Sequence, residues 1–257
     1  ILQNFDSNFR LGDGNAFIIE GDEYDTAFFD KGPKFMHFHP AAAVLTSVEF
    51  DHADIFRDLN HVQTVFSRFL AQLKPSTLLL AFDADENIRR IISEAHCRVQ
   101  FYGSDVHSDW CLGDIQIDAP RSVFEILKSG QRYGRFETQM LGRHNLYNAL
   151  AVIAIADDLG ISPAEIKAAL ATFKGVKRRQ QIRGRKNQIT VMDDFAHHPT
   201  AVRETVTAVK SFQSPQRLIA VFEPRTNSSM RDVFQKVYPL AFDDADLICI
   251  RQPPLLE

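Results

Sequence analysis

The sequence predicts an α/β fold, in which a mostly parallel sheet carries helices on both faces and a second, smaller α/β unit follows. Three observations lead to this prediction. Short apolar runs alternate with segments of helical spacing. The apolar runs are nearly continuous, as in parallel strands that are buried on both faces. Residues 103–141 instead break into short alternating segments separated by glycines, which indicates a small antiparallel excursion.

The composition is that of a globular protein and excludes several classes. The chain has 257 residues, with 29 Lys and Arg against 33 Asp and Glu, and 45% of its residues are hydrophobic. Without a basic excess, we expect no general binding to nucleic acid. No apolar run approaches the roughly 20 residues of a membrane span, so we expect no membrane insertion. The 3 cysteines are widely spaced and form no CxxC pair, which favours a reducing, cytoplasmic location.

The first part of the chain predicts the parallel sheet and the helices that cover it. Helical spacing of apolar residues predicts helices over Leu59–Leu73 and Asp85–Ala95, and the first of them stops before Pro75. The predicted strands are the apolar runs Ala16–Glu20, Ala43–Val48, Thr77–Phe82 and Arg98–Tyr102.

The middle of the chain predicts the antiparallel excursion and then two helices. The antiparallel strands are expected at Asp114–Ile117, Ser122–Leu127 and Arg132–Glu137. The alanine-rich run Asn145–Leu159 predicts a buried helix. Ser162, with Pro163 next and Glu165 three residues on, predicts the N-cap of a helix that runs to about Phe173.

A second β/α cycle begins after Gly175. The basic stretch Lys174–Arg179 is the expected hinge, so we predict one domain over residues 1–174 and a second over 175–257. The second cycle is expected to contain strands at Gln188–Met192, Arg217–Phe222 and Asp246–Ile250, and helices at His198–Phe212 and Ser228–Phe242. The chain opens on Ile1 and stops just after an apolar run, so we expect a fragment of a longer protein.

Acidic and histidine side chains follow two of the predicted strands. Glu20 is the last residue of the predicted strand Ala16–Glu20 and opens a run of four acids. Asp51 and His52 follow the predicted strand Ala43–Val48. Ligands of open parallel sheets bind at the carboxyl ends of the strands. Carboxylates and imidazole there suit a hard divalent ion such as Mg²⁺ or Mn²⁺. A solvated acidic turn and a loop hydrogen bond are the alternatives.

Three further motifs carry polar side chains at element ends. Asn145 and Asn148 lie three residues apart at a helix start, hence on one face, and their carboxamides suit the edge of an adenine. Helix capping by Asn145 is the alternative. The stretch Asp193–Thr200 places acids and two histidines between a strand and a helix. Arg225, after the next strand, is suited to clamp a carboxylate or phosphate.

Taken in order, these motifs resemble the Mur ligase family, whose members build the peptide of bacterial peptidoglycan with ATP. The resemblance spans essentially the whole chain and rests on EGDEYD (20–25), EFDH (49–52), GRHNLYN (142–148), the arginine pair 178–179 and DDFAHHPT (193–200). It implies the family's central ATP-binding domain followed by part of its Rossmann-like C-terminal domain. The family's phosphate loop and UDP-binding domain would precede residue 1, and no GxxxxGK[ST] occurs in the chain.

The resemblance also assigns the metal and the adenine. Glu20 and His52 match the family's Mg²⁺ ligands and would act in catalysis through that ion. Asn145 and Asn148 match the residues that hold the adenine of ATP. The implied cofactors are therefore ATP and Mg²⁺.

The other assignments fall in the second domain. Arg179 matches an arginine that reaches the ATP phosphates, and Asp194 matches an acid near the nucleotide ribose. His197 and Arg225 fall where this domain faces the incoming amine substrate. The resemblance thus implies catalytic roles for Arg179 and His197 and substrate contacts for His197 and Arg225.

The implied reaction forms an amide bond through an acyl phosphate. The partners would be UDP-N-acetylmuramate and either a peptide or an amino acid. The stretches Glu20–Lys31, Glu49–Phe56 and Glu223–Asn227 are more similar to the member that adds L-alanyl-γ-D-glutamyl-meso-diaminopimelate during peptidoglycan recycling. The member that adds L-alanine is the alternative, and a non-catalytic nucleotide- or metal-binding module is a second one. Lacking a phosphate loop, the chain alone is expected to fold but not to turn over.

Overall fold

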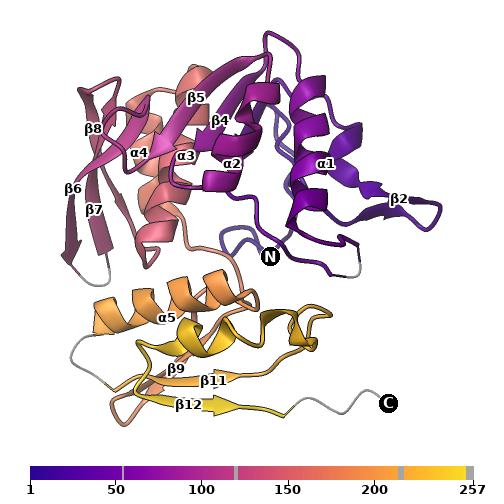
Figure 1. The fold of residues 1–257 in the computed structure, drawn as a ribbon. Helices are drawn as coiled ribbons and strands as arrows, with labels where there is room; N and C mark the ends of the chain where they lie inside the picture. Colours follow the sequence, from indigo (N-terminus) through magenta and orange to yellow (C-terminus); the bar gives the residue numbers. More distant parts are fainter. Residues whose placement is uncertain (54, 119–120, 214–216, 253–257) are drawn as a thin grey trace.

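The central feature of the fold is a six-stranded sheet in the order β3-β4-β5-β6-β7-β8. The structure is a computed structural model that describes residues 1–53, 55–118, 121–213 and 217–252. The sheet and its helices form the upper part of Figure 1, and residues from about 180 onward form the lower part. Helix α5 lies on the side of the lower part that faces the upper part (Figure 1).

The first half of the sheet is parallel, as the apolar runs predict. Strands β3 (Ala42–Leu45), β4 (Leu78–Phe82) and β5 (Arg98–Gly103) pair in parallel, and β6 (Trp110–Asp118) continues parallel to β5. Alternate residues of β4 enter the two cores, Leu78 and Leu80 on one face and Leu79 and Ala81 on the other. The continuous apolar run of β4 follows from this burial on both faces.

Helices cover both faces of the sheet. On one face lie α1 (Leu59–Gln72), α2 (Glu86–Ile91) and the short 3₁₀ turn η2 (Ile92–Glu94). On the other lie α3 (Arg143–Asp158) and α4 (Pro163–Thr172). The predicted capping box of α4 is confirmed, since Ser162 and Glu165 each bond the other's backbone N–H.

The antiparallel excursion is confirmed too. Strands β6, β7 (Arg121–Lys128) and β8 (Gln131–Thr138) pair in antiparallel order and complete the sheet. Phe124 and Phe136 from this excursion are almost fully buried in the core under α3. The excursion therefore belongs to the central sheet and is not a separate unit.

The C-terminal part contains two small sheets and one long helix. Strands β9 (Gln181–Lys186) and β10 (Ile189–Asp193) form an antiparallel pair, and β11 (Ile219–Phe222) pairs in parallel with β12 (Leu247–Ile250). Helix α5 (Pro199–Gln213) packs on the second pair through a core of its own. Strand β9 was not predicted, because three of its six residues are charged and five are exposed, so it has no apolar run.

Two predicted elements are wrong. Ala16–Glu20 is not a strand: it is an exposed segment without regular secondary structure, and no described strand pairs with it. Ser228–Phe242 is not one helix. It contains two 3₁₀ turns, η3 (Asp232–Phe234) and η4 (Tyr238–Phe242). Pro239 cannot donate a helical hydrogen bond, and Ser229 bonds locally to Thr226, which favours turns.

Short local structure surrounds the central sheet at its start. After the acidic run, β1 (Asp25–Ala27) and β2 (Asp30–Pro33) form an antiparallel hairpin, followed by the 3₁₀ turn η1 (Lys34–His37). The first residues of the chain pack on the connector between the two parts. Leu2 bridges to Val176, and Ile1 accepts a hydrogen bond from the backbone of Lys177.

A helix that spans a membrane is long and apolar. Within the described ranges, none of the helices combines the length and the apolar character that crossing a bilayer requires.

Candidate functional site

The loop of residues 49–53, after β3, is where the two parts of the chain meet. We call it the 49–53 loop. His52 at its centre is only 8% exposed and has a positive φ of 50°. Left-handed backbone is uncommon for a residue with a side chain and is often found at functional sites. The Asp51 carboxylate accepts the His52 backbone N–H at 2.7 Å, which supports this conformation.

The carboxylate that contacts His52 is that of Glu23. Its Oε1 lies 2.6 Å from His52 Nε2, and the Tyr24 ring packs on the imidazole with centroids 4.1 Å apart. Glu20 is exposed and forms no ion pair or hydrogen bond with any residue that the structure describes. The expectation that Glu20 and His52 lie at adjacent strand ends is wrong, because the strand Ala16–Glu20 does not form. That both side chains lie within reach of one ion stays a prediction.

Asp51 connects the 49–53 loop to the C-terminal part. Its Oδ2 lies 3.8 Å from His197 Nε2, and Ser228 donates a hydrogen bond to the carboxylate. Burial alone would raise the pKa of Asp51. The hydrogen bonds from Ser228 and from the His52 backbone, with the nearby imidazoles, outweigh burial and hold this pKa below its ordinary value. Asp51 is thus held as a carboxylate between the two parts.

Other contacts fasten the same loop. Thr200 Oγ1 donates to Glu49 Oε2 at 2.5 Å, and Arg231 Nη1 donates to the Ala53 carbonyl at 3.0 Å. The rings of Phe50 and Phe234 lie 6.3 Å apart between centroids. Polar and aromatic contacts together hold the C-terminal part against the 49–53 loop.

His198 joins helix α5 to this loop through both ring nitrogens. Nε2 donates to the Phe50 carbonyl at 3.2 Å, and Nδ1 accepts the Thr200 backbone N–H at 3.3 Å. Nδ1 also lies 3.6 Å from Glu49 Oε2. The same side chain therefore caps the first turn of α5 and spans the two parts.

The two candidate adenine residues lie at the start of α3. Asn148 is exposed, and Asn145 is half-buried. Asn145 Nδ2 donates to the Leu141 carbonyl at 2.7 Å, and Asn148 Nδ2 lies 3.5 Å from Asn145 Oδ1. Asn145 also contacts Gln180 Oε1, at 3.3 Å, on the connector to the C-terminal part. The pair faces the junction and leaves Asn148 accessible to a ligand.

Arg179 and Asp194 lie on the other side of this junction. Arg179 is exposed between two residues with positive φ, Arg178 at 60° and Gln180 at 48°. Within the described residues, it has no carboxylate partner. The Asp194 carboxylate accepts the backbone N–H groups of Gln180 and Ala196, both at 2.7 Å. The Arg179 guanidinium lies over the Phe195 ring, with its carbon 5.9 Å from the ring centroid.

The two candidate amine-substrate residues differ in place. His197 lies near Asp51, and its carbonyl accepts a hydrogen bond from the Tyr238 hydroxyl. Burial, and secondarily the charge of Asp51, raises the pKa of Tyr238 to about 12, so the hydroxyl stays a donor. Arg225 is on the surface, where its Nε lies 2.6 Å from Glu223 Oε2. The structure brings His197, and not Arg225, into contact with the 49–53 loop.

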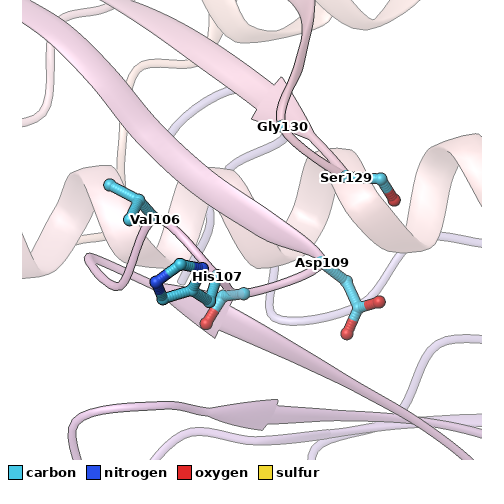
Figure 2. Close-up of a pocket in the computed structure, with 6 residues that line it drawn as sticks. Val106, His107, Asp109, Ser129 and Gly130 are labelled. Carbon is cyan, nitrogen blue, oxygen red and sulfur yellow. The ribbon is translucent and has the colours of Figure 1, made fainter.

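A small polar hollow lies away from this junction. It has a volume of about 350 Å³ beyond the end of β5, and Figure 2 shows its lining by Val106, His107, Ser108, Asp109, Ser129 and Gly130. None of the residues assigned above lines it. We therefore place the candidate site at the junction.

The donor atoms around His52 include the carboxylate oxygens that a hard divalent ion prefers. No group of three or more metal-ligating side chains gathers among the described residues. Imidazole and carboxylate are nevertheless near, from His52, Glu23 and Asp51. Mg²⁺ is commonly held by one or two protein ligands together with waters and substrate phosphates. The donors present fit such a shared site and do not form an all-protein cage.

Sequence reasoning missed three residues of this junction. Glu23 was in the noted acidic run, and Glu49 was in the motif EFDH, but neither was singled out. Gln180 follows the arginine pair and carries no motif at all. Its contacts, with Asn145 and Asp194, join positions 35 and 14 residues away in the chain.

Comparison with known proteins matches both parts of the chain to one family. The family model described as the Mur ligase middle domain matches residues 2–156, and that described as the Mur ligase, glutamate ligase domain matches residues 178–253. A UDP-N-acetylmuramate–L-alanyl-gamma-D-glutamyl-meso-2,6-diaminoheptandioate ligase from Haemophilus influenzae is 37% identical over 100% of this chain and 56% of its own length. A UDP-N-acetylmuramate–L-alanine ligase from Syntrophomonas wolfei is 36% identical over 88% of this chain and 48% of its own length.

A solved structure shares the fold. The crystal structure of a murein peptide ligase from Psychrobacter arcticus superposes with a TM-score of 0.64 at 32% identity, covering 92% of this chain and 48% of that one. The chain thus spans about half the length of the relatives that it matches.

Proposed function

Because the chain belongs to the Mur ligase family, we propose that it is part of an ATP-dependent amide-bond ligase of peptidoglycan metabolism. One observation carries the proposal. Four motifs far apart in the sequence converge at the junction: the 49–53 loop, the start of α3, the connector at Arg179 and the segment from Asp194 to Thr200. We place the boundary between the domains at residues 174 and 175.

The proposed substrates are UDP-N-acetylmuramate and L-alanyl-γ-D-glutamyl-meso-diaminopimelate. Relatives named for this pair are 36–37% identical over 97–100% of the chain, whereas the L-alanine ligases that cover 95–97% of it are 30–33% identical. The L-alanine ligase from Syntrophomonas is 36% identical over 88% of the chain, so addition of L-alanine is the second candidate. The choice depends on the residues that contact the amine.

Each side chain of the junction has a proposed role. Asn145 and Asn148 hold the adenine of ATP, Asp194 bonds the ribose, and Arg179 binds the phosphates. Arg179 suits this role because it is exposed and the described residues offer it no carboxylate. Positioning and neutralising charge are what phosphoryl transfer requires of a protein.

The remaining roles concern the ion and the incoming amine. His52 and Glu20 hold Mg²⁺, with Glu23 orienting the imidazole from its other side, as carboxylates commonly do for metal-bound histidines. ATP supplies the phosphoryl group that activates the substrate carboxylate, and Mg²⁺ offsets its charge. His197 and Arg225 contact the incoming amine substrate. Closure of the two domains over the 49–53 loop excludes water from the activated carboxylate.

The test is a ligase assay on the full-length gene product. With ATP, Mg²⁺ and UDP-N-acetylmuramate, we expect phosphate release that depends on the added tripeptide and a product whose mass is the sum of the two substrates less water. A greater kcat/KM with L-alanine would select the second candidate. Nucleotide binding without phosphate release under any of these conditions would favour a non-catalytic module and refute the proposal.

The 257-residue chain alone serves as a control in this assay. It lacks a GxxxxGK[ST] loop, so we expect it to fold and to release no phosphate. Phosphate release comparable to that of the full-length protein would show that the proposed placement of the active site is wrong.

A further inference from the structure

Gln180 connects two residues that were assigned to the nucleotide. It is 9% exposed and has a positive φ of 48°. Its backbone N–H donates to Asp194 Oδ2 at 2.7 Å, and its side-chain Oε1 lies 3.3 Å from Asn145 Nδ2. Gln180 therefore lies between the proposed adenine side and the proposed ribose side of the junction.

The other half of the Gln180 amide has no partner. Among the described residues, no acceptor lies within hydrogen-bonding reach of the buried Nε2. An unpaired buried polar group destabilises a protein, and native structures rarely retain one. A donor left unpaired beside a proposed ligand site points to an acceptor on the ligand.

The orientation of this amide follows from its neighbours. Asn145 Nδ2 faces the Leu141 carbonyl at 2.7 Å, and a carbonyl only accepts, so this nitrogen is fixed as a donor. Gln180 must then present its oxygen to Asn145, and Nε2 must point elsewhere. Asn145 is already satisfied by Leu141 and by His144 Nε2 at 3.0 Å, so it does not require Gln180.

We propose that Gln180 is a nucleotide-binding residue whose Nε2 donates a hydrogen bond to an acceptor of the nucleoside of ATP. The inference rests on the proposed function, because Asn145 and Asp194 mark the adenine and the ribose. Adenine ring nitrogens and ribose oxygens are acceptors of the required kind. The backbone bond to Asp194 holds the donor in place before the nucleotide arrives.

The test compares Gln180→Met and Gln180→Glu in the full-length gene product, with Gln131→Met as the matched control. Gln131 is exposed at the start of β8, which is the edge strand of the central sheet opposite to β3. Calorimetry gives the Kd for ADP, steady-state kinetics gives KM for ATP, and thermal unfolding without nucleotide gives Tm. Methionine keeps the shape of the side chain and removes the donor, whereas glutamate replaces the donor with an acceptor.

We expect Gln180→Met to weaken ADP binding and raise KM for ATP by about tenfold, which is the loss of one hydrogen bond. Its Tm without nucleotide should be unchanged or higher, because an unpaired buried amide is removed. Gln180→Glu should weaken binding further, since two acceptors would face each other. The Gln131→Met control should match the wild type. Weaker binding without a loss of Tm separates ligand contact from a structural role.

An unchanged Kd for ADP in Gln180→Met would overturn the inference, and so would a lower Tm that accounts for the whole loss of binding. A double variant with Asn145→Ala adds a check, because two residues on one nucleoside should show non-additive losses. If the wild-type protein binds ADP but releases no phosphate, the proposed function fails while the calorimetry still decides the role of Gln180.

Discussion

At the scale of single residues, the geometry of the junction depends on which carboxylate contacts His52. The sequence pointed to Glu20 as the end of a strand, but the structure places Glu23 Oε1 on His52 Nε2. Our proposal keeps both residues, with Glu20 as a ligand of the ion and Glu23 as the group that orients the imidazole. The two roles give different kinetic consequences.

Replacing each acid by its amide separates these roles. In the full-length protein, Glu20→Gln should lower kcat by on the order of 10²-fold, because the ion loses a charged ligand that matters most in the transition state. Glu23→Gln should lower kcat by about tenfold or less, since a glutamine oxygen still accepts from His52. The measurement is kcat as a function of Mg²⁺ concentration. If Glu23→Gln is the more damaging change, Glu23 is the metal ligand and the assignment of Glu20 is wrong.

His198 gives a second prediction, because its two ring nitrogens make different contacts. Nε2 contacts the Phe50 carbonyl, and Nδ1 contacts the Thr200 backbone N–H. An asparagine oxygen can replace Nδ1 and cap α5, and a glutamine nitrogen can replace Nε2 and reach the Phe50 carbonyl. We expect His198→Gln to keep kcat near the wild-type value and to lose about 1 kcal/mol of stability with the cap.

The matched variant His198→Asn should behave in the opposite way. It keeps the cap, so urea unfolding should change little, but it loses the bond across the junction and kcat/KM should fall about fivefold. Measuring stability and kinetics on both proteins tests the assignment. Equal losses of kcat/KM in the two variants would show that the bond to Phe50 does not hold the 49–53 loop for catalysis.

At the scale of elements, the helices α1, α2 and α4 begin at capping residues that the sequence contains. Asp58 and Asp85 cap α1 and α2, and Ser162 and Glu165 form the box that begins α4. These signals are local: they involve residues within one turn, so neither the sheet nor the second domain alters them. The strands required more, because a strand is stable only beside a neighbour.

The capping box of α4 gives a stability prediction. Ser162→Ala should lower the free energy of unfolding by about 1 kcal/mol, because the Glu165 backbone N–H loses its acceptor. Ser162→Thr keeps the hydroxyl and is the control. Urea unfolding measures both. An unfolding free energy for Ser162→Ala equal to the wild-type value would mean that packing, and not the cap, fixes the start of α4.

The same box predicts the sign of a pH effect. The hydrogen bond from the Ser162 side chain, with that from its backbone, lowers the pKa of Glu165 below 4.5. A depressed carboxyl pKa contributes stability above the ordinary value, and that contribution is lost as pH falls through the folded-state pKa. The difference between wild type and Ser162→Ala should therefore shrink in urea unfolding below about pH 4. A constant difference across this range would contradict the pairing.

At the scale of the whole molecule, the two domains contact each other between the start of α3 and helix α5. A Cβ built on Gly142 would lie 2.5 Å from the Ala208 Cβ on α5, and the Gly142 φ of 91° is itself left-handed. His144 Nδ1 lies 3.6 Å from Glu204 Oε2 of the same helix. Gly142 therefore permits the close approach of the two domains.

Gly142→Ala tests this contact. Left-handed strain should reduce stability by about 1–2 kcal/mol, and the clash should also move α5 away from α3. Gly160→Ala is the control, because Gly160 has a φ of 77° but no atom within 4 Å of its Cβ position. Small-angle scattering of the two variants should show a larger radius of gyration for Gly142→Ala only. Equal radii would mean that this contact does not set the distance between the domains.

The sequence by itself determined the parallel strands β3, β4 and β5, the presence of antiparallel strands within residues 103–141, the helices α1, α3 and α4, and the capping box of α4. These depend on periodicity and on contacts within a few residues, which a chain carries wherever it folds. It also placed the 49–53 loop and Asn145, because both follow directly from the ends of elements.

The tertiary structure decided the rest. Whether Ala16–Glu20 becomes a strand depends on a neighbouring strand, and no described strand pairs with it. That Glu23 meets His52, and that Gln180 lies between Asn145 and Asp194, depends on the packing of segments far apart in the chain. Hydrogen bonds form between atoms about 3 Å apart, and sequence spacing does not carry that distance across a fold.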